Sequence, residues 1–183
     1  MIGTPPGRTP DDMSPASRTA SPPPPPQGGA ATTVPVPAPA GGSSAGGLAL
    51  SVVMGPGTPR VGDEVTVEIG AASSTGVVDA PLHLLYDPAR LRFVAATEGD
   101  FMNRDGASTV FLVNGQSRPG DVVIGIGRTD RSHGAGGRGT LCLVRFKVLA
   151  SGAASVAIGS AMAWGADGRL LPVSTGAAEI QVP

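Results

Sequence analysis

Residues 48–183 predict an all-β domain, a β-sandwich or jelly roll of about nine short strands. Three observations lead to this fold class. Short segments of alternating apolar and polar residues recur, turns rich in Gly and Pro separate them, and no ten-residue window has the apolar spacing of an amphipathic helix. The expected strands are Leu48–Met54, Glu64–Gly70, Val77–Tyr86, Leu91–Thr97, Thr109–Asn114, Asp121–Arg128, Thr140–Leu149, Ala154–Ile158 and Gly176–Val182.

The first four strands are the most regular in their alternation. After the turn Gly55–Pro59, aliphatic side chains alternate with polar ones from Glu64 to Ile69, which indicates one buried and one solvated face. In the third strand, Leu82–Tyr86 repeats this period of two. Asp87-Pro88 then predicts a turn, because proline presets φ and the aspartate can accept hydrogen bonds from the following amides.

The later strands follow the same logic. Thr109–Asn114 and Asp121–Arg128 predict a hairpin, because Arg118-Pro119-Gly120 lies between them. Gly134–Gly139 predicts a loop, and the strand after it alternates between apolar and basic side chains. The segment from Gly159 to Pro172 is less regular, with a turn expected at Asp167-Gly168.

Residues 1–47 predict a disordered linker. They contain 12 of the 19 prolines and 8 of the 28 glycines, including the run Pro22–Pro26, the segment Val34–Ala40 and the tract Gly41–Gly47. Proline runs favour polyproline II, Gly-Ser tracts are flexible, and apolar content this low cannot offset the entropy of ordering. We therefore expect a tether of residues 1–47 and one domain of residues 48–183. Recognition of Pro22–Pro26 by a proline-binding domain is the alternative use of the segment.

Charge and hydropathy argue against two classes of partner. The formal net charge is −1 and no basic run or stripe exists, so neither nucleic acid nor an anionic membrane surface is expected to bind. The apolar runs are far shorter than the roughly 20 residues of a membrane helix, so no span is expected in this chain. Residues 1–47 also lack the pattern of a signal peptide, and we expect any export signal to lie upstream of the given sequence.

No catalytic site and no cofactor are expected. Neighbouring residues of an extended chain point apart, so Ser132 and His133 are expected not to serve each other as nucleophile and base. Cys142 is the sole cysteine, which excludes an intrachain disulfide, and its alternation with core residues predicts a small buried side chain.

The acidic segment Glu98–Asp105 gives a weak signal for calcium. Asn103 and Asp105 fit the third and fifth ligand positions of an EF-hand loop, but the first and twelfth would be Phe101 and Leu112, which cannot bind a hard cation. The sequence therefore excludes an EF-hand loop, and a calcium site assembled from several loops is left open.

The six aromatic residues bear on sugar binding. Tyr86, Phe93 and Phe146 lie on expected core faces. Trp164, Phe101 and Phe111 are left as candidates for stacking against a carbohydrate, and Trp164 and Phe101 are the two expected to form the site.

Four segments of the domain resemble the cohesin family. They are VGDEVTVEI at Val61–Ile69, LHLLYDPARLRFVAATEGDF at Leu82–Phe101, VVIGIGR at Val122–Arg128 and GTLCLVRFKVLASG at Gly139–Gly152. The YDP-x-x-L element and the Gly-Asp pair after the fourth strand are the most specific parts. The chain looks most like the cohesin variant appended to the C-terminus of bacterial type II secretion secretins, which a proline-rich linker commonly precedes.

The resemblance implies a non-catalytic, nine-stranded jelly-roll sandwich related to carbohydrate-binding modules. Cellulosomal cohesins bind dockerin modules through a sheet face that includes the third strand. The matching outward positions here, with two more on a neighbouring strand, are Asp79, Pro81, His83, Leu85, Val123 and Gly125. Cellulosomal cohesins often carry asparagine and aspartate at the first two of these positions, so Asp79 keeps part of that pattern and Pro81 departs from it.

Two functional hypotheses follow. The first is a protein-interaction module of the bacterial envelope, outside the cytoplasm and associated with protein secretion, whose partner is a dockerin-like module or a secretion component. The second is a polysaccharide-binding module that uses Trp164 and Phe101. Exposed, coplanar rings of these two residues would favour the second hypothesis.

Overall fold

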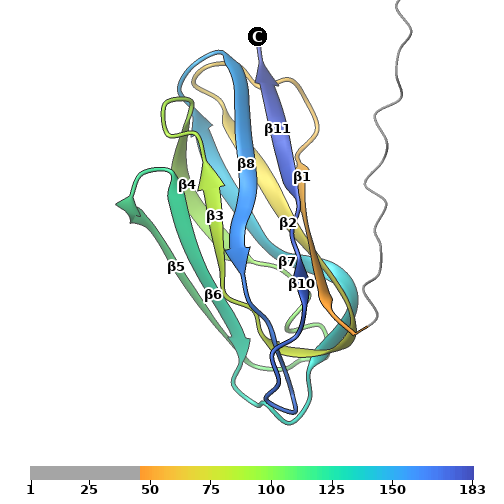
Figure 1. Cartoon of the computed structure of the whole chain (residues 1–183). Coiled ribbons are helices and arrows are strands. Elements are labelled where there is room, and N and C mark those ends of the chain that lie inside the picture. Colours follow the sequence, from red (N-terminus) through yellow and green to blue (C-terminus); the bar gives the residue numbers. More distant parts are fainter. Residues whose placement is uncertain (1–45) are drawn as a thin grey trace, which may run out of the picture. The chain divides into compact units, whose positions relative to one another are not determined.

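The computed structural model describes residues 46–183, which form a β-sandwich without a helix (Figure 1). The expected linker therefore lies almost wholly outside the described residues. The strands are β1 (Leu48–Met54), β2 (Glu64–Asp79), β3 (Leu82–Tyr86), β4 (Leu91–Glu98), β5 (Thr109–Arg118), β6 (Asp121–Arg128), β7 (Ala135–Val148), β8 (Gly152–Ala161), β9 (Trp164–Gly165), β10 (Val173–Ser174) and β11 (Ala177–Val182).

The strands make two layers. The front sheet has the order β11-β8-β3-β6-β5, and the back sheet has the order β10-β1-β2-β7-β4 (Figure 1). The carboxyl end of β2 crosses between the layers, because Asp79 pairs with Gly127 of β6 on one side and with Trp164 of β9 on the other. The all-β sandwich predicted by the sequence is confirmed.

Alternation along each strand explains the two layers. In β3, Leu82, Leu84 and Tyr86 are buried, while His83 and Leu85 point outward. β2 and β7 do the same, with apolar residues inward and charged residues outward. A side-chain period of two lets each sheet bury one face against the other.

Three aromatic rings join the layers at one end of the core. Tyr86 belongs to the front sheet, whereas Phe146 and Phe93 belong to the back sheet. The Phe146 ring centroid lies 4.9 Å from that of Tyr86 and 6.3 Å from that of Phe93. Their assignment to the core is confirmed, although Phe93 is only partly buried.

The strand count and two boundaries differ from the sequence prediction. β2 runs without interruption to Asp79, so the expected third strand is divided between β2 and β3. Pro81 lies at the division, where its missing amide hydrogen cannot extend a ladder. β2 persists through residues 71–76, which lie between the second and third expected strands, because β1 and β7 pair with it on both sides.

The predicted loop Gly134–Gly139 is also wrong. β7 already begins at Ala135 and pairs with β2 through a register shift near Gly70. Short strand β9 lies within the segment expected to be irregular and β10 lies just after it, so eleven strands replace the nine expected. Glycine has weak strand propensity, and tertiary pairing overrides it here.

The predicted turns are present. The amides of Ala89 and Leu91 donate to the side chain and carbonyl of Asp87, at 2.9 Å in both cases. The β5–β6 hairpin closes through Pro119-Gly120, where Gly120 has a φ of 90°, which glycine adopts without strain. Gly168, with a φ of 76°, turns the hairpin that follows β9.

Candidate interaction surface

The six residues expected to bind a partner lie on the outer side of the front sheet. His83 is directly opposite Val123, and Leu85 is directly opposite Asp121 in the β3–β6 ladder. Opposite residues of antiparallel strands project to the same face. The outward side chains of β3 and β6 therefore form one surface, and the expected residues are brought together.

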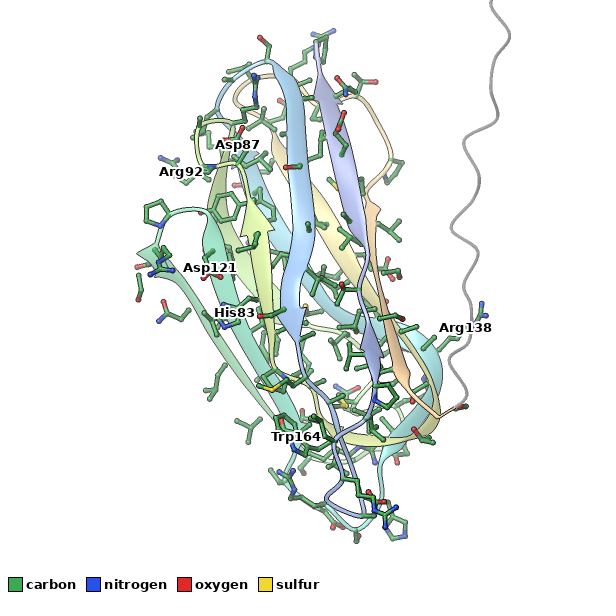
Figure 2. All side chains as sticks on the ribbon, viewed as in Figure 1. His83, Asp87, Arg92, Asp121, Arg138 and Trp164 are labelled. Carbon is green, nitrogen blue, oxygen red and sulfur yellow. The ribbon has the colours of Figure 1, made fainter. Side chains whose placement is uncertain are left out.

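A histidine–carboxylate pair lies within this surface. Nδ1 of His83 lies 3.1 Å from Oδ1 and 3.3 Å from Oδ2 of Asp121 (Figure 2). The Asp121 side chain is 14% exposed and that of His83 is 45% exposed. Since a carboxylate only accepts, Nδ1 carries the hydrogen and Nε2 is left for a partner. The pair orients the imidazole outward on an otherwise apolar region.

Apolar side chains surround the His83–Asp121 pair, and a glycine on the adjacent strand gives one of them room. Leu85, which is 44% exposed, lies over Gly159 of β8. A Cβ at Gly159 would come within 2.5 Å of Leu85 Cδ1, so glycine is what lets this leucine lie flat across β8. Val123 is exposed beside it. The result is a shallow apolar surface on a rigid sheet.

β5 extends this surface with two residues that the sequence analysis did not single out. Leu112 is opposite Gly125, and Val110 is opposite Gly127. Leu112 is 66% exposed and Val110 is exposed as well. The predicted β5–β6 hairpin was the sequence feature that indicated this extension, because pairing these strands places outward residues of β5 beside Val123 and Gly125.

A polar end completes the surface where β2 meets β6 and β9. Oδ2 of Asp79 lies 3.4 Å from Nη1 of Arg131, and the carboxylate covers Gly127. Trp164 is the cross-strand neighbour of Asp79 and shares its face, at the end of the front sheet away from Asp87 (Figure 2). We call the whole surface the front face, and it comprises Asp79, Pro81, His83, Leu85, Val110, Leu112, Asp121, Val123, Gly125 and Trp164.

Phe101 does not join Trp164 at the surface. Its side chain is 1% exposed and belongs to the core. Backbone hydrogen bonds hold the segment after β4 against β7: the amide of Gly99 donates to the carbonyl of Leu141 and that of Phe101 to the carbonyl of Thr140, both at 2.9 Å. A Cβ at Gly99 would lie 2.1 Å from the Thr140 oxygen, which explains the glycine of the Gly-Asp pair. The expectation of Phe101 as a sugar-stacking ring is therefore wrong.

The geometry expected of Ser132 and His133 is also wrong. The chain bends here and is not extended, so Ser132 Oγ lies 2.8 Å from His133 Nδ1. The neighbouring carboxylate, Asp130, accepts from the Ser132 amide at 2.9 Å, and its hydrogen bonds with Ser132 lower the pKa of Asp130. Because this carboxylate contacts the serine and not the histidine, the three groups do not form an acid–histidine–nucleophile relay.

The acidic residues proposed for calcium each have a protein partner. Glu98 accepts from the Thr109 hydroxyl at 2.6 Å, Asp100 accepts from the Thr140 amide at 2.8 Å, and Asp105 forms a bidentate pair with buried Arg128. In residues 46–183, no group of three or more His, Cys, Asp or Glu side chains is placed to hold a metal ion.

Cys142 has the environment that the sequence predicted. It is fully buried in the core, and desolvation raises the pKa of its thiol to about 12. No helix in the described residues is long and apolar enough to cross a membrane.

Several solved structures resemble the chain at low sequence identity. A non-cellulosomal cohesin of Archaeoglobus fulgidus is 18% identical, with a TM-score of 0.59 over 75% of this chain and 91% of that one. A type II cohesin of Acetivibrio cellulolyticus, determined in a cohesin–X–dockerin complex, is 15% identical, with a TM-score of 0.63 over 74% and 99%. A cohesin module of a Clostridium perfringens family 33 glycoside hydrolase is 14% identical, with a TM-score of 0.59 over 73% and 96%.

Comparison of the sequence with known protein families assigns the chain to one of them. A search of curated proteins found no match to the chain. The family description "Cohesin domain" matches residues 51–179, which is well over half of the sequence and spans the strands from β1 into β11. The chain therefore belongs to the cohesin-domain family, whose members are non-catalytic protein-interaction modules.

Proposed function

We propose that the domain binds a dockerin-like protein partner on the front face, outside the cytoplasm and in association with protein secretion. The observation that carries the proposal is the composition of this face. Leu85, Leu112 and Val123 are exposed together around the His83–Asp121 pair. Contiguous exposed apolar surface of this kind, with a few polar groups, marks a site of protein interaction.

The shape and chemistry of the face favour a helical partner. Outward strand residues make a shallow surface, and a helix can lay an apolar stripe across such a surface. Nε2 of His83 and the carboxylates of Asp121 and Asp79 would accept from hydroxyl or amine donors beside that stripe. Three similar cohesin structures support this choice of partner, because they were determined in complexes with dockerins.

A titration of purified proteins tests the proposal. The full chain would be titrated by calorimetry with dockerin modules and with any single protein it retains from an envelope extract of its own organism. Leu85→Asp is expected to weaken binding at least tenfold, because it places a charge at the centre of the contact. Leu149→Asp is the matched control, since Leu149 is a leucine of similar exposure outside the front face. Equal binding by both variants would contradict the proposed site.

Polysaccharide binding is the competing outcome of the same experiment. The single ring of Trp164, beside the Asp79–Arg131 ion pair, could stack on one sugar unit. Retention of the wild-type chain on insoluble polysaccharide, lost in Trp164→Ala and kept in Leu85→Asp, would replace the protein partner with a carbohydrate.

The cellular setting is proposed from the sequence. Its support is the resemblance to cohesins attached to type II secretion secretins and the proline-rich composition of residues 1–47. Fractionation of the native organism with an antibody to the domain tests it. Recovery in the outer membrane or periplasm, with a secretin in the same complex, is expected, and recovery with cytoplasmic proteins would overturn this part.

A further inference from the structure

We propose that the free edge of β5 pairs with β5 of a second copy of the chain, antiparallel and about a two-fold axis through Leu112. β5 pairs with β6 alone among the described strands. β4 contacts β5 only through side chains: the Phe93 ring packs on Gly115, and the Thr109 hydroxyl donates to Glu98. No backbone ladder joins the two strands. The inference does not depend on the proposed partner of the front face.

The direction of the free amides follows from two hydrogen bonds. The Thr129 amide donates to the carbonyl of Ser108, on the β5 side of β6. The Ala80 amide donates to the carbonyl of Ile126, on the other side of β6. Because backbone groups alternate along an antiparallel strand, Val110 and Leu112 bond β6, while Phe111 and Val113 direct their amides to the open edge.

The composition of β5 makes this edge unusual in the molecule. Residues 109–117 contain no charged residue and no proline, and Val110, Leu112 and Val113 are exposed. Proteins commonly protect sheet edges with charges, bulges or very short strands. The other edges have such protection: β4 carries Arg92 and a bulge, β11 carries Glu179, and β10 has two residues. In β5 the register to β6 is regular from Thr109 to Asn114 and shifts only between Asn114 and Arg118, so residues 109–114 form the unprotected edge.

The two-fold axis must pass through a residue, because only residues whose amides face the same way can be opposite each other. An axis at Phe111 would set Leu112 of one copy opposite Val110 of the other and leave the two Leu112 side chains apart. An axis at Val113 would set Phe111 beside Gly115, where Phe93 already packs. An axis at Leu112 keeps Phe111 away from Gly115 and sets the two Leu112 side chains, the most exposed apolar side chains of β5, opposite each other.

The Leu112 register also makes favourable pairs. Phe111 of one copy lies opposite Val113 of the other, as a hydrogen-bonded pair, and the two Leu112 side chains meet on the outer side. The strand is thus complementary to itself in backbone hydrogen bonding and in apolar contact.

The consequence is a continuous sheet across two copies. An axis perpendicular to the sheet places both front faces on the same side, joined at Leu112. A dimer would present two partner surfaces next to each other, and a partner with two binding segments would gain avidity from them.

Analytical ultracentrifugation of the full chain at about 1–200 μM tests the proposal across the range of weak association. A monomer–dimer equilibrium is expected. Val113→Pro should weaken it at least tenfold, because proline removes an edge donor without touching the ladder to β6. Leu85→Asp, away from β5, should leave the dimer unchanged. A monomer throughout, a larger assembly, or a dimer lost in Leu85→Asp but kept in Val113→Pro would overturn the proposal.

A cysteine variant tests the register and does not rely on the proline variant folding well. Opposite residues of a non-hydrogen-bonded pair have Cα atoms about 4.5 Å apart, within reach of a disulfide. Under mild oxidation Leu112→Cys should form a covalent dimer, since the native Cys142 is buried. Val53→Cys, which also replaces an exposed side chain but lies on β1, should stay monomeric. Equal cross-linking of the two variants would overturn the two-fold axis at Leu112.

Discussion

The outer faces of the two sheets have the same strand geometry but outward side chains of opposite character. On the back sheet, Glu64 lies opposite Lys147 and 3.4 Å from Arg145, and Glu68 accepts from the Thr140 hydroxyl at 2.7 Å. On the front face the corresponding positions of β3, β5 and β6 are mostly leucine, valine and glycine. The charged side chains of the back face are well hydrated, whereas the front face exposes apolar side chains to solvent.

This difference indicates where binding costs least. Removing charged groups from water is expensive unless each finds a partner, so the back face resists being covered. Covering the front face removes apolar area from water at roughly 25 cal/mol per Å² and desolvates few polar groups. The contrast between two faces of one sandwich, and not the fold alone, selects the interaction surface.

The largest effect is expected from a substitution in the core that supports both faces. Phe146→Ala is expected to lower the free energy of unfolding by about 3–5 kcal/mol, because Phe146 is fully buried between Tyr86 and Phe93. Urea denaturation followed by circular dichroism measures it. A loss below about 1 kcal/mol would show that the two sheets do not depend on this ring.

A matched pair of substitutions tests the faces separately. Val123 on the front face and Val94 on the back sheet are both 37% exposed. Val123→Asp is expected to weaken binding of the partner by about 2 kcal/mol, roughly 30-fold, as at an interface hot spot. Val94→Asp should change the dissociation constant less than about twofold. Calorimetric titration compares the two, and a larger effect of Val94→Asp would assign binding to the back sheet.

The sequence predicted the sandwich because period-two alternation is a local property. β1 and β6 were predicted with their observed bounds, and the Asp87 turn formed as its residues require. The failures are where tertiary pairing decides. β2 runs through a Gly- and Ser-rich stretch only because β1 and β7 pair with it there.

The candidate surface was predictable to the extent that it followed from alternation and family resemblance. His83 and Leu85 point outward as their positions in β3 predict. The burial of Phe101 was not predictable, because it depends on hydrogen bonds between the end of β4 and distant β7. The contribution of Leu112 required the β5–β6 register, which short strands leave open until they are paired.

The smallest effect expected concerns a carboxylate that fastens the back sheet. The amide of Thr140 donates to Asp100, and this bond, opposed in part by desolvation and aided by Arg104 at 3.1 Å, lowers the pKa of Asp100. A lowered pKa means that the ionised form stabilises the fold. The contribution is complete above the unfolded-state pKa of about 4 and is lost as pH falls through the lower folded-state pKa.

Asp100→Asn should therefore destabilise the domain at pH 7, by no more than about 1 kcal/mol because solvent screens this exposed group. The variant should also lose less stability than the wild-type chain between pH 5 and pH 2. Thermal unfolding at the two pH values measures the difference. Front-face binding at pH 7 should be unchanged, since Asp100 lies at the junction of β4 and β7. An equal acid response in both chains would mean that the Thr140–Asp100 bond does not contribute to stability, and a loss of binding would mean that the two faces are coupled through this junction.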